Sequence, residues 1–372
     1  MQLAIERSTL LKSLAHIQNV VERRTTIPIL GNVKLEAGKG ELRLTATDLD
    51  LELAIREPAA VTEPGTTTVA AHTLFEIVRK LPEGCEVTLS CGAGANELTL
   101  RAARSRFELP TLPADEFPAL GEDELPVAFA LPAPLLQRLI DKVRFAMSTE
   151  ETRYYLNGIH FHVLRQRGGG LLRAVATDGH RLARIEAELP AGADGLPPII
   201  VPRKTVGEMR KLVDGREGNV DVEVSTSRIR LEVDGSVLTS RLIDGQFPDY
   251  ERVIPKSAER VAVLETRPFA QAVDRVSTIS TERMRAVKLS FANGQVVLSS
   301  ISPESGRASD ELDVEYSGEP LEIGFNARYI LDMLDEIDGE QVRFEMTSAA
   351  APTVVRDPAD PGVLFVLMPM RV

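Results

Sequence analysis

The sequence has little of what marks a membrane protein, a metal protein or a disulfide-bonded protein. No run approaches the roughly 18 apolar residues of a membrane span, and Glu6 and Arg7 interrupt the N-terminus where a signal peptide is apolar. The two cysteines, Cys85 and Cys91, form no CxxC pair and have no neighbouring histidine, so we expect structural thiols. We therefore expect a cytoplasmic protein without a metal, a disulfide or another cofactor.

Catalytic groups are also sparse. The chain has five histidines, and none forms a recognisable triad or metal spacing. His180 follows an Asp-Gly pair, but general-base chemistry needs a second group to orient the base, and Asp-Gly is equally typical of a hairpin turn. The segment 168–170 lacks the Lys-Ser/Thr that follows in a phosphate loop, and it favours a hairpin between strands. The sequence offers no catalytic constellation.

The sequence does contain an internal repeat. Ala46-Thr47-Asp48 recurs as Ala176-Thr177-Asp178, and Phe117-Pro118 recurs as Phe247-Pro248, in both cases 130 positions later. Two independent pairs at one offset are not expected by chance. The chain therefore contains at least two copies of a unit of about 130 residues.

A third copy follows from the order of the expected elements. An apolar strand end that opens a helix occurs at 69–73, 200–204 and 323–327, and each is followed by an amphipathic helix and a turn. We expect two helices per copy, at 7–22, 72–81, 133–147, 203–213, 267–279 and 327–337. Segments such as 41–45 and 221–224 alternate polar and apolar residues, which is typical of half-buried antiparallel strands.

The predicted fold class is α+β, with three repeated domains in which two helices pack on antiparallel sheets. A chain of 372 residues is too long for one ordinary core. Segments near 113–126 and 245–255 carry proline and glycine and are plausible linkers. We therefore place the N-terminal domain at 1–124, the central domain at 125–253 and the C-terminal domain at 254–372.

The net charge of −12 is unevenly distributed. Counted with their flanking residues, five of the six expected helices are net positive, and only 326–338 is net negative. The six together carry +7, which leaves −19 for the rest of the chain. In the helix at 133–147, Leu136 and Leu139 belong to an apolar stripe, so Arg138 and Lys142 are expected to share the solvent side. Exposed helix faces are often charged, but five of one sign in an acidic chain indicate an anionic partner.

Double-stranded DNA fits as that anionic partner. Contacts of Lys and Arg with phosphates carry no sequence information, so a basic surface without base-reading elements binds any duplex. The sequence shows no helix-turn-helix, zinc finger or aromatic stacking platform. Sequence-independent binding of DNA is therefore predicted.

Five segments resemble the bacterial DNA polymerase III beta subunits, the beta sliding clamps. The segments are Thr26–Asn32, Arg153–Gly158, Val175–Ala183, Asp244–Tyr250 and Met368–Val372. They occur in that family's order from the first residue to the last, so the resemblance covers essentially the whole chain.

The resemblance implies three clamp domains per chain and two chains that close head to tail as a homodimeric ring lined by helices. Such a ring stays on DNA because it is topologically closed, so an acidic protein needs no strong phosphate contact, and its acidic exterior favours threaded DNA. The implied function is a DNA sliding clamp, a processivity factor without its own catalytic site. It would tether the replicative polymerase catalytic subunit to double-stranded DNA.

Residue roles also follow from the resemblance. Positions that match the family's DNA-contacting residues are Arg24, Tyr155, Arg203 and Lys204. Positions that match the dimer interface are Phe107 and Leu109 on one side and Ile279 on the other. Thr278 stands where a large aliphatic residue is familiar, so this interface should be less apolar.

The apolar end of the chain matches one border of the family's partner-peptide pocket. The matching positions are Leu156, Thr177, Gly179, His180, Arg181, Leu182, Pro248, Arg252, Val253, Asn326, Tyr329, Val366, Met368, Pro369, Met370 and Arg371. The resemblance implies a ligand that is a short linear peptide rich in Gln and Leu/Phe. It would come from a polymerase, the clamp loader or a repair protein.

Two other functions remain open from the residues alone. A sequence-independent DNA-binding protein that forms no ring would show the same basic helices, but it would leave circular and linear DNA equally fast. A nucleotide-processing enzyme would need catalytic residues for its turnover, and none can be assigned in this sequence.

Overall fold

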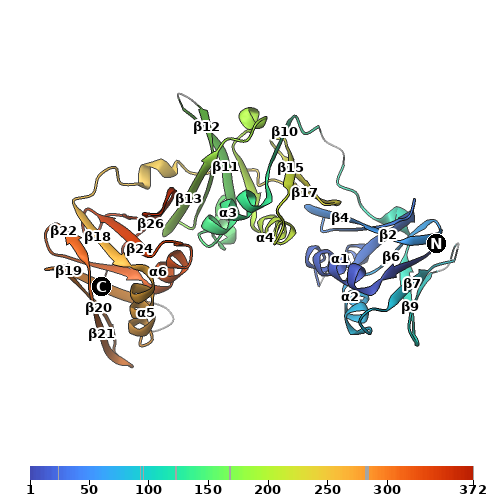
Figure 1. Ribbon diagram of the computed structural model, residues 1–372, viewed down its shortest axis with the longest axis horizontal. Coiled ribbons are helices and arrows are strands. Elements are labelled where there is room, and N and C mark those ends of the chain that lie inside the picture. Colours follow the sequence, from blue (N-terminus) through green and yellow to red (C-terminus); the bar gives the residue numbers. More distant parts are fainter. Residues whose placement is uncertain are drawn as a thin grey trace. The chain divides into compact units, whose positions relative to one another are not determined.

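The computed structural model describes residues 1–23, 25–92, 94, 96–121, 124–166, 169–280 and 285–371. In these residues, antiparallel strands and α-helices follow one element order that occurs three times (Figure 1). Each repeat runs strand, helix, several strands, helix and three strands. The predicted α+β class and the two helices per repeat are thus confirmed. No helix in the described part is long and apolar enough to cross a membrane.

The first repeat shows how the sequence pattern produces the elements. They are β1 (Gln2–Glu6), α1 (Arg7–Val20), β2 (Asn32–Gly38), β3 (Glu41–Thr47), β4 (Leu51–Pro58), β5 (Ala60–Glu63), β6 (Gly65–Ala70), α2 (Ala71–Lys80), β7 (Glu86–Ser90), β8 (Glu97–Ala102) and β9 (Ser105–Leu112). In α1 the buried residues Leu10, Leu14 and Ile17 recur every three or four positions, so one stripe of the helix faces the core. In β7 every second residue is buried, as in a half-covered strand.

The second repeat has the same order. Its elements are β10 (Val127–Pro132), α3 (Ala133–Arg144), β11 (Gly158–Gln166), β12 (Gly169–Thr177), β13 (Arg181–Glu188), β14 (Ile199–Pro202), α4 (Arg203–Leu212), β15 (Asn219–Val224), β16 (Arg228–Val233) and β17 (Ser236–Arg241). The apolar stripe expected in α3 is buried, with Leu139 and Ile140 fully covered.

One prediction for α3 is wrong. Lys142 does not lie on the solvent side, because its residue is 5% exposed and its ammonium donates to the carbonyl oxygen of Glu336 at 2.5 Å and to Asp338 Oδ2 at 2.8 Å. Arg138 forms an ion pair with Asp360. Acidic residues of the third repeat therefore pack against both cations, which helical periodicity within α3 cannot reveal.

The third repeat completes the series. Its elements are β18 (Arg260–Glu265), α5 (Thr266–Ser277), β19 (Ala286–Ala292), β20 (Gln295–Ser302), β21 (Gly306–Asp313), β22 (Glu315–Ser317), β23 (Leu321–Asn326), α6 (Ala327–Leu334), β24 (Gln341–Met346), β25 (Thr353–Asp357) and β26 (Asp360–Leu367). The helix α6 begins after Asn326 because the side-chain oxygen of this residue accepts the N–H of Arg328 at 2.9 Å.

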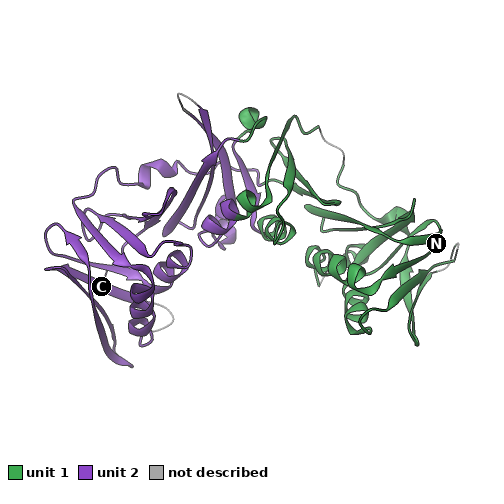
Figure 2. Cartoon of the chain, in the orientation of Figure 1, with its two compact units in different colours: residues 1–137, 190–197, 204–242 green, residues 138–189, 198–203, 243–372 purple. Residues whose placement is uncertain are grey.

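The described strands form three sheets within two compact units (Figure 2). The units comprise residues 1–137, 190–197 and 204–242, and residues 138–189, 198–203 and 243–372. In the first unit, β10 and β15 to β17 join the strands of the first repeat in a 13-stranded sheet. The second unit holds a nine-stranded sheet, in which β11 to β14 join strands of the third repeat, and a four-stranded sheet. The second repeat therefore contributes to both units.

Two strand pairs join successive repeats by one rule. Antiparallel β17 and β4 place Ser240 opposite Leu51, and antiparallel β26 and β13 place Leu367 opposite Arg181. In each case the last strand of one repeat pairs with the fourth strand of the repeat before it. In the described residues, the Ser105–Pro110 part of β9 pairs with β8 alone, and β21 pairs with β20 alone.

The repeated Ala-Thr-Asp motifs form matching turns. Asp48 Oδ1 accepts the N–H groups of Asp50 and Leu51 between β3 and β4, and Asp178 Oδ1 accepts those of His180 and Arg181 between β12 and β13. The residue after the aspartate has φ 81° at Leu49 and φ 88° at Gly179. This left-handed conformation suits glycine and strains leucine. The 130-residue repeat is therefore also a repeat of local geometry.

Candidate functional site

An apolar hollow of about 250 Å³ lies in the second unit. Its walls come from the 3₁₀ turn at Glu151–Leu156, the β12–β13 turn, the connector before β18 and the end of β26. The lining residues are Leu156, Thr177, Gly179, Arg181, Leu182, Pro248, Asp249, Tyr250, Val253, Val366 and Met368. Segments far apart in the chain meet here because the β26–β13 pair brings the end of the chain beside the Asp178 turn.

The floor of the hollow is part of a buried hydrophobic cluster. Leu156, Leu182, Tyr250 and Val366 pack with core residues of the second and third repeats. At the rim, Val253 is 44% exposed and Met368 is 38% exposed. A fixed floor with exposed apolar side chains at the rim can take up an apolar anchor, and the flexible thioether of methionine adapts to different shapes.

Sequence reasoning did not name two of the lining residues, Asp249 and Tyr250. The hydroxyl of Tyr250 lies 2.8 Å from His162 Nε2 and accepts a hydrogen bond from Arg173 Nη1 at 3.1 Å. The buried environment raises the pKa of Tyr250 and lowers the pKa of His162. The available signal was the position of both residues directly after Pro248 in the Asp244–Tyr250 segment.

The rings beside Tyr250 anchor the same connector. The rings of His160 and Phe247 stack with centroids 4.6 Å apart, and those of His160 and His162 lie 5.0 Å apart. Burial, with the neighbouring His162, lowers the pKa of His160 to about 4. Both histidines come from β11, so this strand holds the two aromatic residues of the connector in place.

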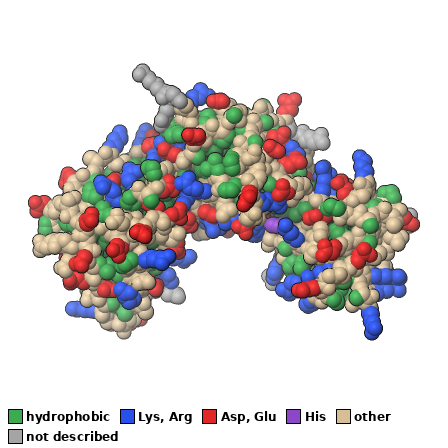
Figure 3. Space-filling view, in the orientation of Figure 1, with side chains coloured by type: hydrophobic (Ala, Val, Ile, Leu, Met, Phe, Trp, Pro, Cys, Tyr) green, Lys and Arg blue, Asp and Glu red, His purple; other side chains and the backbone are tan. Residues whose placement is uncertain are grey.

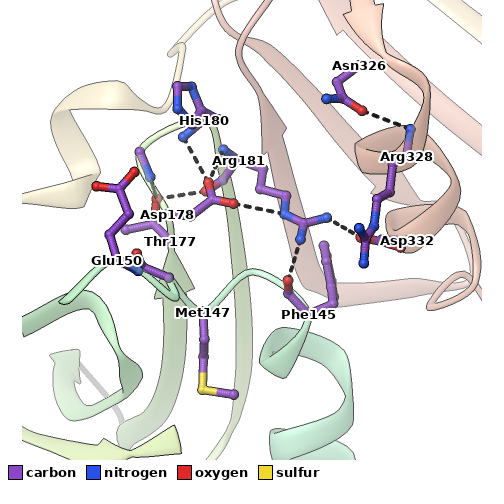
Figure 4. Close-up of polar contacts among 12 residues, drawn as sticks. Phe145, Met147, Glu150, Thr177, Asp178, His180, Arg181, Asn326, Arg328 and Asp332 are labelled. Carbon is purple, nitrogen blue, oxygen red and sulfur yellow. Dashed lines mark hydrogen bonds and ion pairs between the residues drawn. The ribbon is translucent and has the colours of Figure 1, made fainter. Parts of the chain in front are cut away.

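Arg181 is the most heavily bonded side chain of the hollow (Figure 4). Its Nε donates to Asp178 at 3.2 Å, its Nη1 to Asp332 at 2.6 Å, and its Nη2 to the carbonyl oxygen of Phe145 at 2.6 Å. The guanidinium carbon lies 4.4 Å from the centroid of the Tyr329 ring. The hollow therefore contains a guanidinium that is already held on each of its three nitrogens.

Seven of the predicted pocket residues do not line the hollow itself. These are His180, Arg252, Asn326, Tyr329, Pro369, Met370 and Arg371. Several lie next to it, because the ring of His180 stacks near that of Tyr329 with centroids 6.3 Å apart and Arg252 pairs with Asp249 at 2.7 Å. Asn326 caps α6, and Met370 N–H donates to Gly324 O at 2.8 Å. Their part in ligand binding stays a prediction.

The predicted DNA-contacting residues are placed as follows. Arg24 lies outside the described residues. Arg203 Nη2 donates to the carbonyl oxygens of Met147 at 2.7 Å and Ser148 at 2.9 Å, and Lys204 Nζ donates to the carbonyl oxygen of Val20 and to Asp48 Oδ2. The half-buried ring of Tyr155 packs edge-on against Tyr154. On the face drawn in Figure 3, basic and acidic side chains are intermixed.

The predicted dimer-interface residues lie on β9 and just after α5. Phe107 is half-buried and Leu109 is buried in the Ser105–Pro110 part of β9, which pairs with β8 alone among the described strands. Ile279 is half-buried just after α5, which packs against β21. Thr278 is exposed beside it.

The chemistry of these residues favours binding over catalysis. Within the described ranges, no group of three or more His, Cys, Asp or Glu side chains could hold a metal ion. The hollow offers apolar walls, a bonded guanidinium and the phenol of Tyr250, whose hydroxyl is hydrogen-bonded with His162 and Arg173.

Known proteins resemble the chain over its full length. Family models for the N-terminal, central and C-terminal domains of the DNA polymerase III beta subunit match residues 1–121, 130–249 and 251–371. The beta sliding clamp of Caulobacter vibrioides is 52% identical over all of both chains, and that of Escherichia coli K12 is 40% identical, also over all of both.

Solved structures agree with these matches. The DNA polymerase sliding clamp of Caulobacter crescentus is 51% identical with a TM-score of 0.94 over all of both chains. A sliding clamp from Bartonella birtlesii bound to griselimycin is 45% identical with a TM-score of 0.97, again over all of both chains.

Proposed function

Since the chain belongs to the beta sliding clamp family, the non-catalytic processivity subunits of DNA polymerase III, we propose that two copies close head to tail into a ring around double-stranded DNA. The ring would slide without sequence specificity and tether the replicative polymerase catalytic subunit. Its proposed location is the cytoplasm, and its proposed domains are 1–124, 125–253 and 254–372.

The rule of strand pairing between repeats carries the proposal of a homodimer. The last strand of the second repeat pairs with the fourth strand of the first, and the last strand of the third pairs with the fourth of the second. In the described residues, the Ser105–Pro110 part of β9, the last strand of the first repeat, and β21, the fourth strand of the third, each have one unpaired edge. If a second copy follows the same rule, its β21 pairs with β9 and two such pairs close the ring.

Two cations at the start of α4 that keep spare N–H donors support the proposal of DNA binding. A guanidinium has five N–H donors and an ammonium has three, so Arg203 and Lys204 keep donors beyond their bonds within the chain. We propose that Arg24, Tyr155, Arg203 and Lys204 face the duplex. Contacts of this kind position the ring on phosphates without reading bases.

The hollow below Met368 supports the proposal of a partner site. Its apolar lining suits the Leu/Phe side chains of a short linear peptide, and polar groups at its rim would fix the direction of the peptide. We propose that polymerases, the clamp loader and repair proteins bind there in turn.

Retention on closed DNA tests the proposed ring. The protein is loaded onto nicked circular DNA with a bacterial clamp loader, and its dissociation is followed before and after a restriction enzyme cuts the circle. We expect slow loss from the circle and loss at least tenfold faster from the cut ends. Equal rates from both forms would instead support the alternative, a sequence-independent DNA-binding protein that forms no ring.

A further inference from the structure

The arginines around the hollow each have a carboxylate of the same chain. Arg153 donates to Glu150 at 2.7 and 2.6 Å, and its guanidinium lies over Gly179, which lines the hollow. At the other side, Arg252 pairs with Asp249 at 2.7 Å. The positive charges at the rim are therefore compensated before any ligand arrives.

Arg181 is compensated most completely. Its side chain is 10% exposed, and each of its three nitrogens donates to an acceptor of the chain. The Tyr329 ring covers the guanidinium at 4.4 Å and the Phe145 ring lies 5.2 Å away. A guanidinium packed against aromatic rings presents a surface for further packing, while its charge is shared with carboxylates.

Of the two carboxylates on Arg181, Asp332 has no other structural task in the turn. Asp178 builds the turn through the N–H groups of His180 and Arg181, so its replacement would disturb the backbone. Asp332 lies on α6, bonds Arg181 at 2.6 Å and is 3.9 Å from Arg328 (Figure 4). Replacing it changes the charge on Arg181 and leaves the turn intact.

We propose that Asp332 is a positioning residue that sets the charge preference of the hollow. It holds Arg181 in the lining and, together with Asp178, compensates its charge, so the hollow selects its ligand by apolar shape and does not favour acidic side chains over amides. This inference rests on the proposed function of the hollow as a peptide site. The Asp332→Asn variant should leave Arg181 with one carboxylate in place of two, so that the hollow becomes more attractive to carboxylates.

Two fluorescent peptides test the inference by anisotropy. Both are rich in Gln and Leu/Phe, and they differ only in having Asp or Asn between the apolar anchors. We expect the wild-type protein to bind them within about twofold of each other. In Asp332→Asn, the preference should move roughly two- to fivefold toward the Asp peptide at low salt and shrink at high salt, because partly exposed ion pairs are weak and screened.

Two variants control for other effects. Asp335→Asn removes the same charge directly after α6 from an exposed position, and we expect it to leave the preference unchanged. Asp332→Glu keeps the charge and should restore the wild-type preference. An equal shift in Asp335→Asn, or equal weakening of both peptides in Asp332→Asn, would overturn the inference. If the wild-type protein binds neither peptide, the proposed peptide site itself is wrong.

Discussion

At the scale of single residues, Arg203 and Lys204 form bonds within the chain besides their proposed contacts with DNA, and their replacement should show both effects. Arg203 bonds the carbonyl oxygens that follow α3, and Lys204 joins the first repeat to the second through Val20 and Asp48. We expect Arg203→Ala and Lys204→Ala to weaken DNA binding equally on all sequences, each removing about one counterion from the salt slope. Lys204→Ala should also cost about 1 kcal/mol of unfolding free energy, because its ammonium is only partly exposed.

Titrations of DNA affinity against salt, on two unrelated duplexes, measure this prediction. Lys256→Ala serves as the control, because Lys256 is an exposed cation in the connector before β18. A loss of affinity on one duplex but not on the other would reject contacts with phosphates.

The two histidines of β11 should make stability depend on pH. Burial lowers the pKa of His160 to about 4 and lowers that of His162. Between pH 6.5 and about 4, the unfolded chain therefore binds more protons at His160 than the folded protein does. This contribution to stability is present above pH 6.5 and is lost as the pH falls through that window. We expect His160 to account for a loss on the order of 1–2 kcal/mol between pH 7 and pH 5.

Urea unfolding of the wild-type protein and of His160→Phe at pH 7 and pH 5 isolates the contribution of His160 to the unfolding free energy. The comparison of variants is needed because burial raises the pKa of Glu336 to about 7, so this carboxyl stabilises the folded protein as the pH falls below that value. The loss between the two pH values should be smaller in His160→Phe. The same loss in both proteins would assign the pH dependence to other groups.

At the scale of elements, the end of the chain has two backbone anchors beyond β26. Met368 N–H donates to His180 O at 2.9 Å, and Met370 N–H donates to Gly324 O at 2.8 Å. Deleting residues 368–372 removes a side chain from the rim of the hollow while β26 keeps its ladder. We expect loss of peptide binding by more than tenfold and loss of polymerase processivity, with an unchanged dimer mass in sedimentation.

Deletion of Val372 alone is the control for this truncation. It leaves every predicted pocket residue in place, so peptide affinity should stay within about twofold of the wild-type value. Unchanged peptide binding after deletion of residues 368–372 would show that the ligand binds elsewhere.

The elements themselves were largely predictable from the sequence, and their partners were not. The six helices were expected within a few residues of their observed ends, because apolar residues such as Leu10, Leu14 and Ile17 recur with helical spacing. Periodicity describes one element at a time. It marked Lys142 as polar and therefore exposed, whereas acidic groups of the third repeat cover it.

In the hollow, too, some residues could be predicted from the sequence and others could not. Resemblance to a family supplied Leu182 and Val366, which meet only because β26 pairs with β13. The resemblance did not predict Tyr250 as a lining residue, because its place depends on bonds to His162 on β11 and Arg173 on β12. A sequence read along one dimension carries no direct sign of such long-range hydrogen bonds.

At the scale of the whole molecule, a pairing rule that occurs twice within the chain explains why three repeats should need a second copy. Each join within the chain consumes the last strand of one repeat and the fourth strand of another. Three repeats make two such joins and leave one edge of β21 and of the Ser105–Pro110 part of β9 unpaired in the described residues. The N–H and C=O groups of an unpaired edge can bond another strand, and a head-to-tail pair of chains would pair both edges at once.

The variant Ile279→Asp tests this assembly. Ile279 is half-buried just after α5, which packs against β21, and in the proposed dimer it would be covered by the β9 side of the partner. A carboxylate placed in such an interface without a counter-charge costs several kcal/mol, so the dimer should dissociate at micromolar concentration in sedimentation. Ile27→Asp makes the same chemical change at a residue that is 46% exposed in the first repeat, and it should leave the dimer intact. A dimer mass that survives Ile279→Asp would place the interface elsewhere on the chain, and a wild-type protein that sediments as a monomer would reject the ring.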